Sequence, residues 1–293
     1  MRERIKIILC IGLIIICLPI VVTMIFQGEE ILPDAGSKSA EENSQQEEDM
    51  LAVFVGLLAE EIPVTYEKEA IKAQAVIVRT NYQYALLHGG ETEKGLSYSE
   101  LVKLFGKEDY TKYYQLLERC IKETENEVIL YQNEPVKAPF FSVSAGATRE
   151  GTGHLRAVES KQDITSEHFL TVEFLTPEEF TEQCNAAFPE AHLTAEHIIE
   201  ALEITEREES GYVKTLRLGE LSVNGEEFRD ALSLPSSCFS IKEVDGQFRI
   251  VTKGLGHGFG LSMYGANELA KEGKTYQDIL KYYYSDVEIG EIE

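Results

Sequence analysis

The sequence predicts an α+β fold, in which mixed helices and an antiparallel-rich sheet follow one N-terminal transmembrane helix. Residues 7–26 carry no charge, and the helical and strand-like segments beyond them alternate without a regular β-α-β order. Glycine also occupies every second position of GLGHGFG, residues 254–260. Because each glycine weakens a strand by roughly 0.5–1 kcal/mol, this run indicates close approach of another backbone, a helix or a ligand.

The N-terminal segment predicts a membrane anchor. About 20 apolar residues with a rise of 1.5 Å each span a bilayer core. Three basic residues precede the segment and two glutamates follow it, so the positive-inside rule places the N-terminus in the cytoplasm and the rest outside. A cleaved signal peptide is the alternative, but the segment is long and no A-x-A site follows. We therefore expect residues 1–27 to be a cytoplasmic tip and anchor at the cell membrane.

Charge and composition limit the rest of the chain. Residues 28–49 are polar and acidic and predict a flexible linker to an extracytoplasmic domain at 50–293. The net charge of −24 argues against nucleic acid as a partner and against adhesion to an anionic membrane surface. The five cysteines and six histidines show no metal-type spacing, so we expect buried free thiols, no metal site and no cofactor.

The first half of the domain is mostly helical. Ile71, Ala75, Val78 and Tyr82 form one apolar stripe, which predicts a helix over 66–87. The following segments predict a short helix within 89–108, a helix over 110–123, and two strands joined at residues 133–135.

The second half mixes both types of element. It predicts helices over 176–187 and 194–202, then a strand-turn-strand unit with Asn224-Gly225 as a turn signal. QFRIVTKGLGHGFGL predicts a long strand that becomes glycine-rich. Ser262 is suited to cap a helix running to about Glu272, where Gly273 would end it.

Two neighbouring carboxylates are the first candidates for chemistry. Glu60 and Glu61 follow an apolar run and precede Ile62-Pro63. An apolar setting raises the pKa of a carboxyl group, as a general acid working near neutral pH requires. The alternative is a helix end with two solvated carboxylates.

Two cations and a loop follow. Lys72 and Arg79 lie seven residues apart on one face of the predicted helix, where they would clamp a polar ligand or tune a carboxylate. The alternative is a pair of cations whose stems cover the core edge. The small residues of SVSAGATRE, 142–150, suit a loop that approaches a ligand, although the segment by itself slightly favours an ordinary turn.

His257 lies on the side-chain-bearing face of the glycine-rich segment with Leu255 and Phe259. A core histidine with satisfied hydrogen bonds is a serious alternative to a functional one. His257 could also pair with Cys238 as a catalytic nucleophile, but the sequence offers no third group that would orient this pair. The glycines match neither the dinucleotide-binding pattern nor the phosphate-binding loop.

Four segments in order resemble the stage II sporulation protein D family over residues 50–288. GLGHGFGLSMYGANELAKEGKTYQDILKYYY is similar to that family's G-x-GHG-x-G-x-SQYGA and A-x-x-G-x-x-Y-x-x-I-L-x-x-YY patterns. EEIP with YEKEAIKAQAVIVRTNY resembles its E-[MI]-P and EALKAQA-x-x-RTY hallmarks. PFFSVSAGATRE and GEEFRDALSLPSSCFSI resemble its F-x-S-x-S-x-G-x-T and E-x-R-x-x-L-x-LPS-x-x-F segments.

The resemblance implies a membrane-anchored peptidoglycan lytic transglycosylase that acts in forespore engulfment. Such an enzyme cuts peptide-stripped glycan strands between N-acetylmuramic acid (MurNAc) and N-acetylglucosamine (GlcNAc). The resemblance also implies two partners: a cell-wall amidase and a polytopic membrane protein. An amidase-enhancer module that binds glycan without cutting it is the alternative, because such proteins share the domain.

Position by position, the resemblance makes Glu61, and not Glu60, the acidic catalyst. Lys72 and Arg79 take the basic positions of the second hallmark, with roles in ligand contact or electrostatic tuning. The residues expected to line a glycan-binding cleft are Ser144, His257, Ser262 and Tyr264.

The sequence also departs from the family pattern. Met263 replaces the glutamine of SQYGA, which puts an amide hydrogen bond there in doubt, and SAGAT replaces SGG-x-T. Some relatives bind zinc near that loop through cysteine and histidine. No cysteine occurs from 121 to 183, so we expect no zinc site here.

Overall fold

The computed structural model describes residues 35–291 of the chain, which divides into two compact units, 1–52 and 53–293. The predicted membrane anchor at 7–26 lies outside the described residues. No helix within 35–291 combines the length and the apolar character needed to cross a bilayer.

Helix α2, Ala35–Glu61, includes most of the segment predicted to be a flexible linker. Residues 35–49 are helical in this structure, and the flexible linker at 28–49 stays a prediction. The physical reason is local: residues 37–49 have no glycine or proline and contain four glutamates and two glutamines, which favour helices. The domain boundary at residue 50 stays a prediction.

Three helices of the unit 53–293, α5, α9 and α10, pack against α3, whose middle section is buried. The α-helices that follow α2 are α3 Lys68–Leu87, α4 Tyr98–Phe105, α5 Tyr110–Glu123, α6 Pro177–Ala187, α7 Ile198–Ala201, α8 Gly225–Ala231, α9 Met263–Lys271 and α10 Tyr276–Tyr283. Two 3-10 helices accompany them, η1 Lys161–Thr165 and η2 Pro189–Ala191.

The strands form several small sheets, mostly antiparallel. Their bounds are β1 Glu127–Tyr131, β2 Glu134–Pro135, β3 Phe140–Phe141, β4 Leu170–Leu175, β5 Leu202–Arg207, β6 Val213–Leu218, β7 Leu221–Asn224, β8 Phe239–Val244, β9 Gln247–Lys253, β10 Leu261–Ser262 and β11 Glu288–Glu291. The described sheets have the strand orders β11-β1-β2, β4-β9-β8, β5-β6-β7 and β10-β3, and only the last is parallel. The α+β class is confirmed, with several small sheets in place of one.

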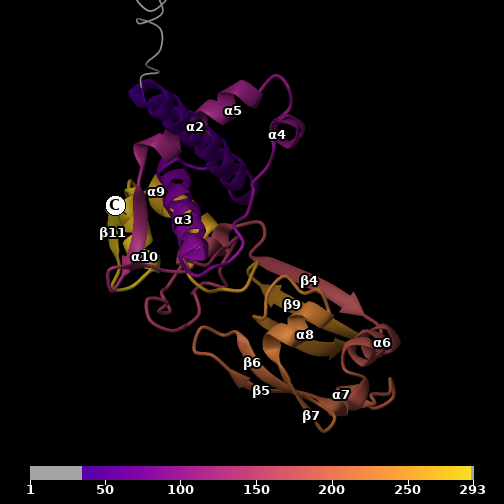
Figure 1. Cartoon of the computed structure of the whole chain (residues 1–293). Coiled ribbons are helices and arrows are strands. Elements are labelled where there is room, and N and C mark those ends of the chain that lie inside the picture. Colours follow the sequence, from indigo (N-terminus) through magenta and orange to yellow (C-terminus); the bar gives the residue numbers. More distant parts are fainter. Residues whose placement is uncertain (1–34, 292–293) are drawn as a thin grey trace, which may run out of the picture. The chain divides into compact units, whose positions relative to one another are not determined.

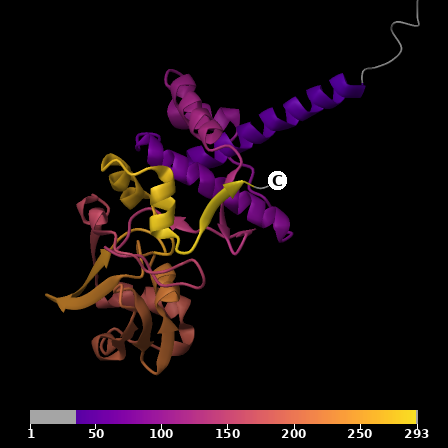
Figure 2. The ribbon, with the colours of Figure 1, turned by 90° about the vertical axis from the view of Figure 1, so that its left-hand side faces the viewer.

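Two groups of elements are visible in Figure 1, where α3, α9, α10 and β11 lie together and β4 to β7 with β9 lie together with α6 to α8. Figure 2 shows the same two groups after a 90° turn. The second group has a core of its own, in which the rings of Phe180, Phe228 and Phe248 meet with centroids 4.6 to 6.2 Å apart.

Several element boundaries follow the sequence closely. The predicted helix over 110–123 matches α5, and α3 begins two residues inside the predicted 66–87. The hydroxyl of Ser262 accepts a hydrogen bond from the Gly265 amide at the start of α9, and Gly273 adopts a φ of +88° just beyond its end. The cap and the stop predicted for this helix are therefore confirmed.

Three other boundaries differ from the prediction. Asn224 does not mark the turn between two strands: its side-chain oxygen accepts from the Glu226 amide and caps α8, and the turn lies at Gly219-Glu220. Only residues 198–201 of the helix predicted over 194–202 are helical. The β1–β2 turn lies at Gln132-Asn133, earlier than predicted.

The glycine-rich segment is not a continuation of strand β9, which ends at Lys253. The four glycines of 254–260 all have positive φ, from +75° to +111°, in the region that favours glycine. Leu255 pairs with Val143 through two backbone hydrogen bonds of 2.7 and 3.0 Å. The expected close approach is real: a Cβ on Gly260 would lie 2.0 Å from the carbonyl oxygen of Pro139.

Candidate functional site

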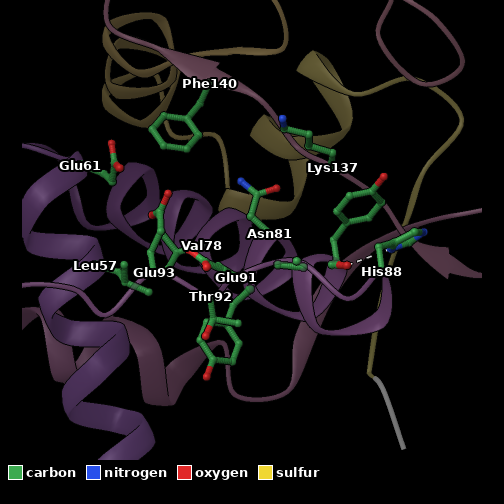
Figure 3. Close-up of a pocket in the computed structure, with 14 residues that line it drawn as sticks. Leu57, Glu61, Val78, Asn81, His88, Glu91, Thr92, Glu93, Lys137 and Phe140 are labelled. Atoms are coloured by element: carbon green, nitrogen blue, oxygen red, sulfur yellow. Dashed lines mark hydrogen bonds between the residues drawn. The ribbon is translucent and has the colours of Figure 1, made fainter.

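Glu61 ends helix α2 at a position where two cavities meet. The first, which we call the α3 cavity, has a volume of about 370 Å³ and is lined largely by α3, the loop 90–93, Lys137 and Phe140. The second, the Tyr264 cavity, has a volume of about 580 Å³. Glu61 lines both of them. Figure 3 shows the α3 cavity with Glu61 and Glu93 at one side and Lys137 and His88 at the other.

The surroundings of Glu61 favour its protonated form. The side chain is half-buried, between the buried Leu57 and Leu58 of α2 and the buried Ile62 that follows. Burial raises the pKa of Glu61, and the negative charges of Glu93 and then Glu60 raise it further. No lysine or arginine of the described residues lies within ion-pair distance of its carboxylate to oppose these effects.

The Tyr264 cavity gathers three of the segments that the sequence analysis identified. It is lined by Glu60 to Pro63, by Ser142 and Val143, and by Leu255, Met263 and Tyr264. The Tyr264 amide donates to the Ser142 carbonyl over 3.0 Å, which joins the start of α9 to the loop after β3. The Tyr264 hydroxyl lies 3.1 Å from the Thr165 hydroxyl. Tyr264 and Met263 thus share a cavity with Glu61.

Ser144 and Ser262, expected to line the cleft, are both fully buried. Each donates a hydrogen bond to Asp163: Ser144 to Oδ2 over 2.5 Å and Ser262 to Oδ1 over 2.8 Å. Burial raises the pKa of Asp163, against the lowering effect of these hydroxyl donors. Through Asp163, both serines therefore join the loop after β3 to the N-terminus of α9.

His257 does not line either cavity. Its ring lies against Phe141 and Phe259, with centroids 5.6 and 6.0 Å apart, and its Nδ1 accepts from the Phe259 amide over 3.1 Å. Burial lowers the pKa of His257, so the ring is neutral near pH 7. This environment matches the alternative of a core histidine whose hydrogen bonds are satisfied.

Arg149 holds the His257 segment in place. Its guanidinium donates to the His257 carbonyl over 3.2 Å and to Glu208 over 2.5 Å, and forms a further ion pair with Glu226. It also lies 4.4 Å from the ring centroid of Phe259. This buried cation connects the glycine-rich segment to the second group of strands.

Lys72 and Arg79 have partners within the protein and are not among the residues that line the two cavities. Arg79 is buried and donates to the carbonyls of Ile121, Thr124 and Glu127 over 2.6 to 3.1 Å, where α5 ends. Lys72 pairs with Glu69 and Glu123 and lies 5.2 Å from the Tyr276 ring centroid. For Arg79 this is a helix C-terminal cap, a structural role.

Sequence reasoning missed Asp163, Glu93, Lys137 and Arg149. Asp163 lies in the short 3-10 helix η1, and nothing near it in sequence shows that two serines 19 and 99 residues away converge on it. Glu93 belongs to a charged loop that reads as solvated. The contacts of the buried Asp163 depend on long-range packing, which local sequence patterns do not encode. Among the described residues, no three histidine, cysteine, aspartate or glutamate side chains gather in a metal-binding group.

Comparison with known proteins gives one family. The family model described as "Stage II sporulation protein" matches residues 39–131. The chain is 30% identical over 260 residues to stage II sporulation protein D of Bacillus amyloliquefaciens, covering 82% of this chain and 73% of the relative. It is equally similar to the protein of that name in Bacillus subtilis (strain 168), covering 74% of it. A segment of 78 residues is 33% identical to the amidase enhancer of Bacillus subtilis, 26% of this chain and 11% of the enhancer.

Proposed function

Because the chain belongs to the stage II sporulation protein D family, a family of sporulation proteins, we propose that it is a peptidoglycan lytic transglycosylase. It cleaves the bond between MurNAc and GlcNAc in peptide-stripped strands and leaves 1,6-anhydro-MurNAc ends during forespore engulfment. The observation that carries the proposal is the position of Glu61, half-buried with a raised pKa where two cavities meet.

One carboxyl group suffices for this reaction. Glycosidases that use water need a pair of carboxylates. Here protonated Glu61 gives its proton to the glycosidic oxygen, and the bond from that oxygen to C1 of MurNAc breaks. The C6 hydroxyl of the same sugar forms the new bond to C1, and its proton passes to the Glu61 carboxylate. The acid is thereby regenerated, and the sugar's own hydroxyl replaces water as the nucleophile.

A matched pair of variants tests the assignment. The full-length protein is incubated with peptide-free glycan strands, and the anhydro-MurNAc ends that form are measured by mass spectrometry. Glu61→Gln keeps the shape of the side chain but cannot donate this proton, so products should fall by at least about 100-fold. Glu108→Gln removes an exposed charge from a residue outside both cavities and should keep activity within a few-fold. Wild-type protein that yields no anhydro ends, or products unchanged in Glu61→Gln, would refute the proposed enzyme.

A non-catalytic amidase-enhancer module is the second candidate. It is supported by the 78-residue similarity to the amidase enhancer and by Met263, which lines the Tyr264 cavity where the family pattern has glutamine. This candidate predicts glycan binding without anhydro products, together with faster peptide removal by a cell-wall amidase in its presence. The same mass-spectrometric assay, run with and without an amidase, separates the two functions.

We propose further that residues 7–26 anchor the protein in the cell membrane, with the N-terminus cytoplasmic and the domain outside. A cell-wall amidase and a polytopic membrane protein are the proposed partners. Protease added to intact protoplasts should degrade the domain and spare a tag at the N-terminus. A protected domain would contradict this orientation.

A further inference from the structure

Among the described residues that line the α3 cavity and the Tyr264 cavity, Lys137 is the only lysine or arginine. It faces a strongly acidic environment, because Glu61, Glu91 and Glu93 line the same α3 cavity. Lys137 is exposed, and no carboxylate of the described residues lies within 4.0 Å of its ammonium. In a chain with 51 acidic and 27 basic residues, an unpaired lysine at this position offers a selective contact for an anionic group.

The backbone that carries Lys137 is held on both sides. The Asn81 side chain exchanges two hydrogen bonds, of 2.8 and 3.0 Å, with the backbone of Ala138. The buried His154 ring hydrogen-bonds the Lys137 carbonyl over 2.9 Å. Phe140, three residues on, pairs with Leu261 in the β3–β10 sheet. The ammonium therefore extends from a rigid support, which lowers the entropy cost of using it to bind a ligand.

The arrangement in the cavity suits a sugar with one negative charge. In the view of Figure 3, Asn81 and Phe140 lie between Lys137 and Glu61, so the cation and the proposed acid are separated within one cavity. The apolar faces of Phe140, Val78 and Leu57 offer surface for a sugar ring. A ligand that places its reacting bond at Glu61 and an anionic substituent at Lys137 would complement both.

We propose that Lys137 binds the lactyl carboxylate of a peptide-free MurNAc residue in the α3 cavity and so selects stripped strands. This inference rests on the proposed function. In an intact strand the lactyl group is joined to the stem peptide through an amide and carries no charge. Removal of the peptide exposes a carboxylate on every MurNAc. A cation in the cavity recognises that new charge, whereas the cavity's own carboxylates repel anions placed elsewhere.

The test compares binding of charged and neutralised glycan. Full chain with Glu61→Gln, which prevents cutting, is titrated with peptide-free glycan fragments and with the same fragments whose lactyl carboxylates are converted to methylamides. Adding Lys137→Gln should weaken binding of the carboxylate form about 3- to 10-fold and leave binding of the methylamide form unchanged. Lys137→Arg should keep the preference, because the charge remains.

Lys107→Gln is the matched control, since it removes one exposed positive charge from a residue outside both cavities. Equal binding of both glycan forms by the parent, or an equal loss in Lys107→Gln and Lys137→Gln, would overturn the inference, as would an absence of glycan binding. Cutting is measured separately in the protein with Glu61. Anhydro products without a carboxylate preference refute only the role of Lys137, and a preference without products refutes only the proposed catalysis.

Discussion

The hydroxyl of Ser262 donates a hydrogen bond to Oδ1 of Asp163 over 2.8 Å, between residues 99 positions apart. Ser144 donates to the other oxygen of the same carboxylate. One buried side chain therefore fixes the loop after β3 and the start of α9, the two segments that bring Ser142, Val143, Met263 and Tyr264 to the Tyr264 cavity. These lining residues of the Tyr264 cavity therefore depend on a residue that does not line it.

Asp163→Asn should lower the free energy of unfolding by about 1–3 kcal/mol, since an amide can accept from only one of the two serine hydroxyls. Urea-induced unfolding at pH 5 measures the change. Asp230→Asn is the control, because the Asp230 side chain is exposed, and it should change stability by less than about 0.5 kcal/mol. Equal effects of the two substitutions would contradict a structural role for Asp163.

The cost of Asp163→Asn should also depend on pH. Burial raises the folded-state pKa of Asp163 above its ordinary value of 3.8, so the neutral form is favoured on folding. Its stabilising contribution is therefore fully present below that ordinary value and is lost as the pH rises through the folded-state pKa. The stability difference between wild type and Asp163→Asn should narrow over this range. A difference that widens with pH would show that the folded-state pKa is depressed.

Glu93→Gln should move the alkaline limb of the pH–rate profile to lower pH. In the proposed mechanism Glu61 acts in its protonated form, so activity is present below its pKa and is lost as the pH rises through it. The charge of Glu93 helps to raise that pKa, and removing it lowers the pKa. Glu93→Asp retains the charge and should keep the limb close to its wild-type position. An alkaline limb that stays in place in Glu93→Gln would show that Glu93 does not tune the acid.

Arg79→Met should cost about 2–4 kcal/mol of stability, because three carbonyls at the end of α5 lose a charged donor. Lys72→Met removes a cation of the same helix that lies nearer the surface, and it should cost less than about 1 kcal/mol. Thermal unfolding measures both. Glycan affinity, corrected for the folded fraction, should be unchanged in Arg79→Met. A stable variant that fails to bind glycan would restore ligand contact as the role of Arg79.

Gly260→Ala and Gly246→Ala together distinguish two costs of replacing a glycine: the steric clash of the new methyl group and the strain of a positive φ. Both glycines have positive φ, +75° and +79°. A Cβ would lie 2.0 Å from the Pro139 oxygen at position 260, and at position 246 it would meet nothing within 4 Å. Gly246→Ala should cost about 1 kcal/mol, and Gly260→Ala more than about 3 kcal/mol, by urea-induced unfolding. Similar costs would mean that the segment moves to accommodate the methyl group.

Local patterns predicted most of the helices and drew attention to the neighbouring carboxylates Glu60 and Glu61, between which the family resemblance selected Glu61. The spacing of Ile71, Ala75 and Val78 identified α3, and the Ser262 cap and Gly273 stop bounded α9. The apolar run before Glu61 indicated a raised pKa, which the structure supports through burial. The glycine alternation of 254–260 was interpreted as a strand, because period two cannot distinguish an extended chain from one in which the glycines take positive φ.

The sequence alone was sufficient for the fold class, the main helices and the family resemblance, because helix patterns depend on neighbours within a few turns and a motif is recognised by its own residues. The resemblance then gave Glu61 as the residue to examine. Only the tertiary structure decided which distant residues these side chains contact. Ser144 and Ser262 are buried against Asp163, and Arg79 donates to carbonyls at the end of α5. Lys137 and Glu93 line one cavity with Glu61. Hydrogen bonding, burial and charge act between residues that are close in space, and for these residues that proximity arises only when distant segments pack.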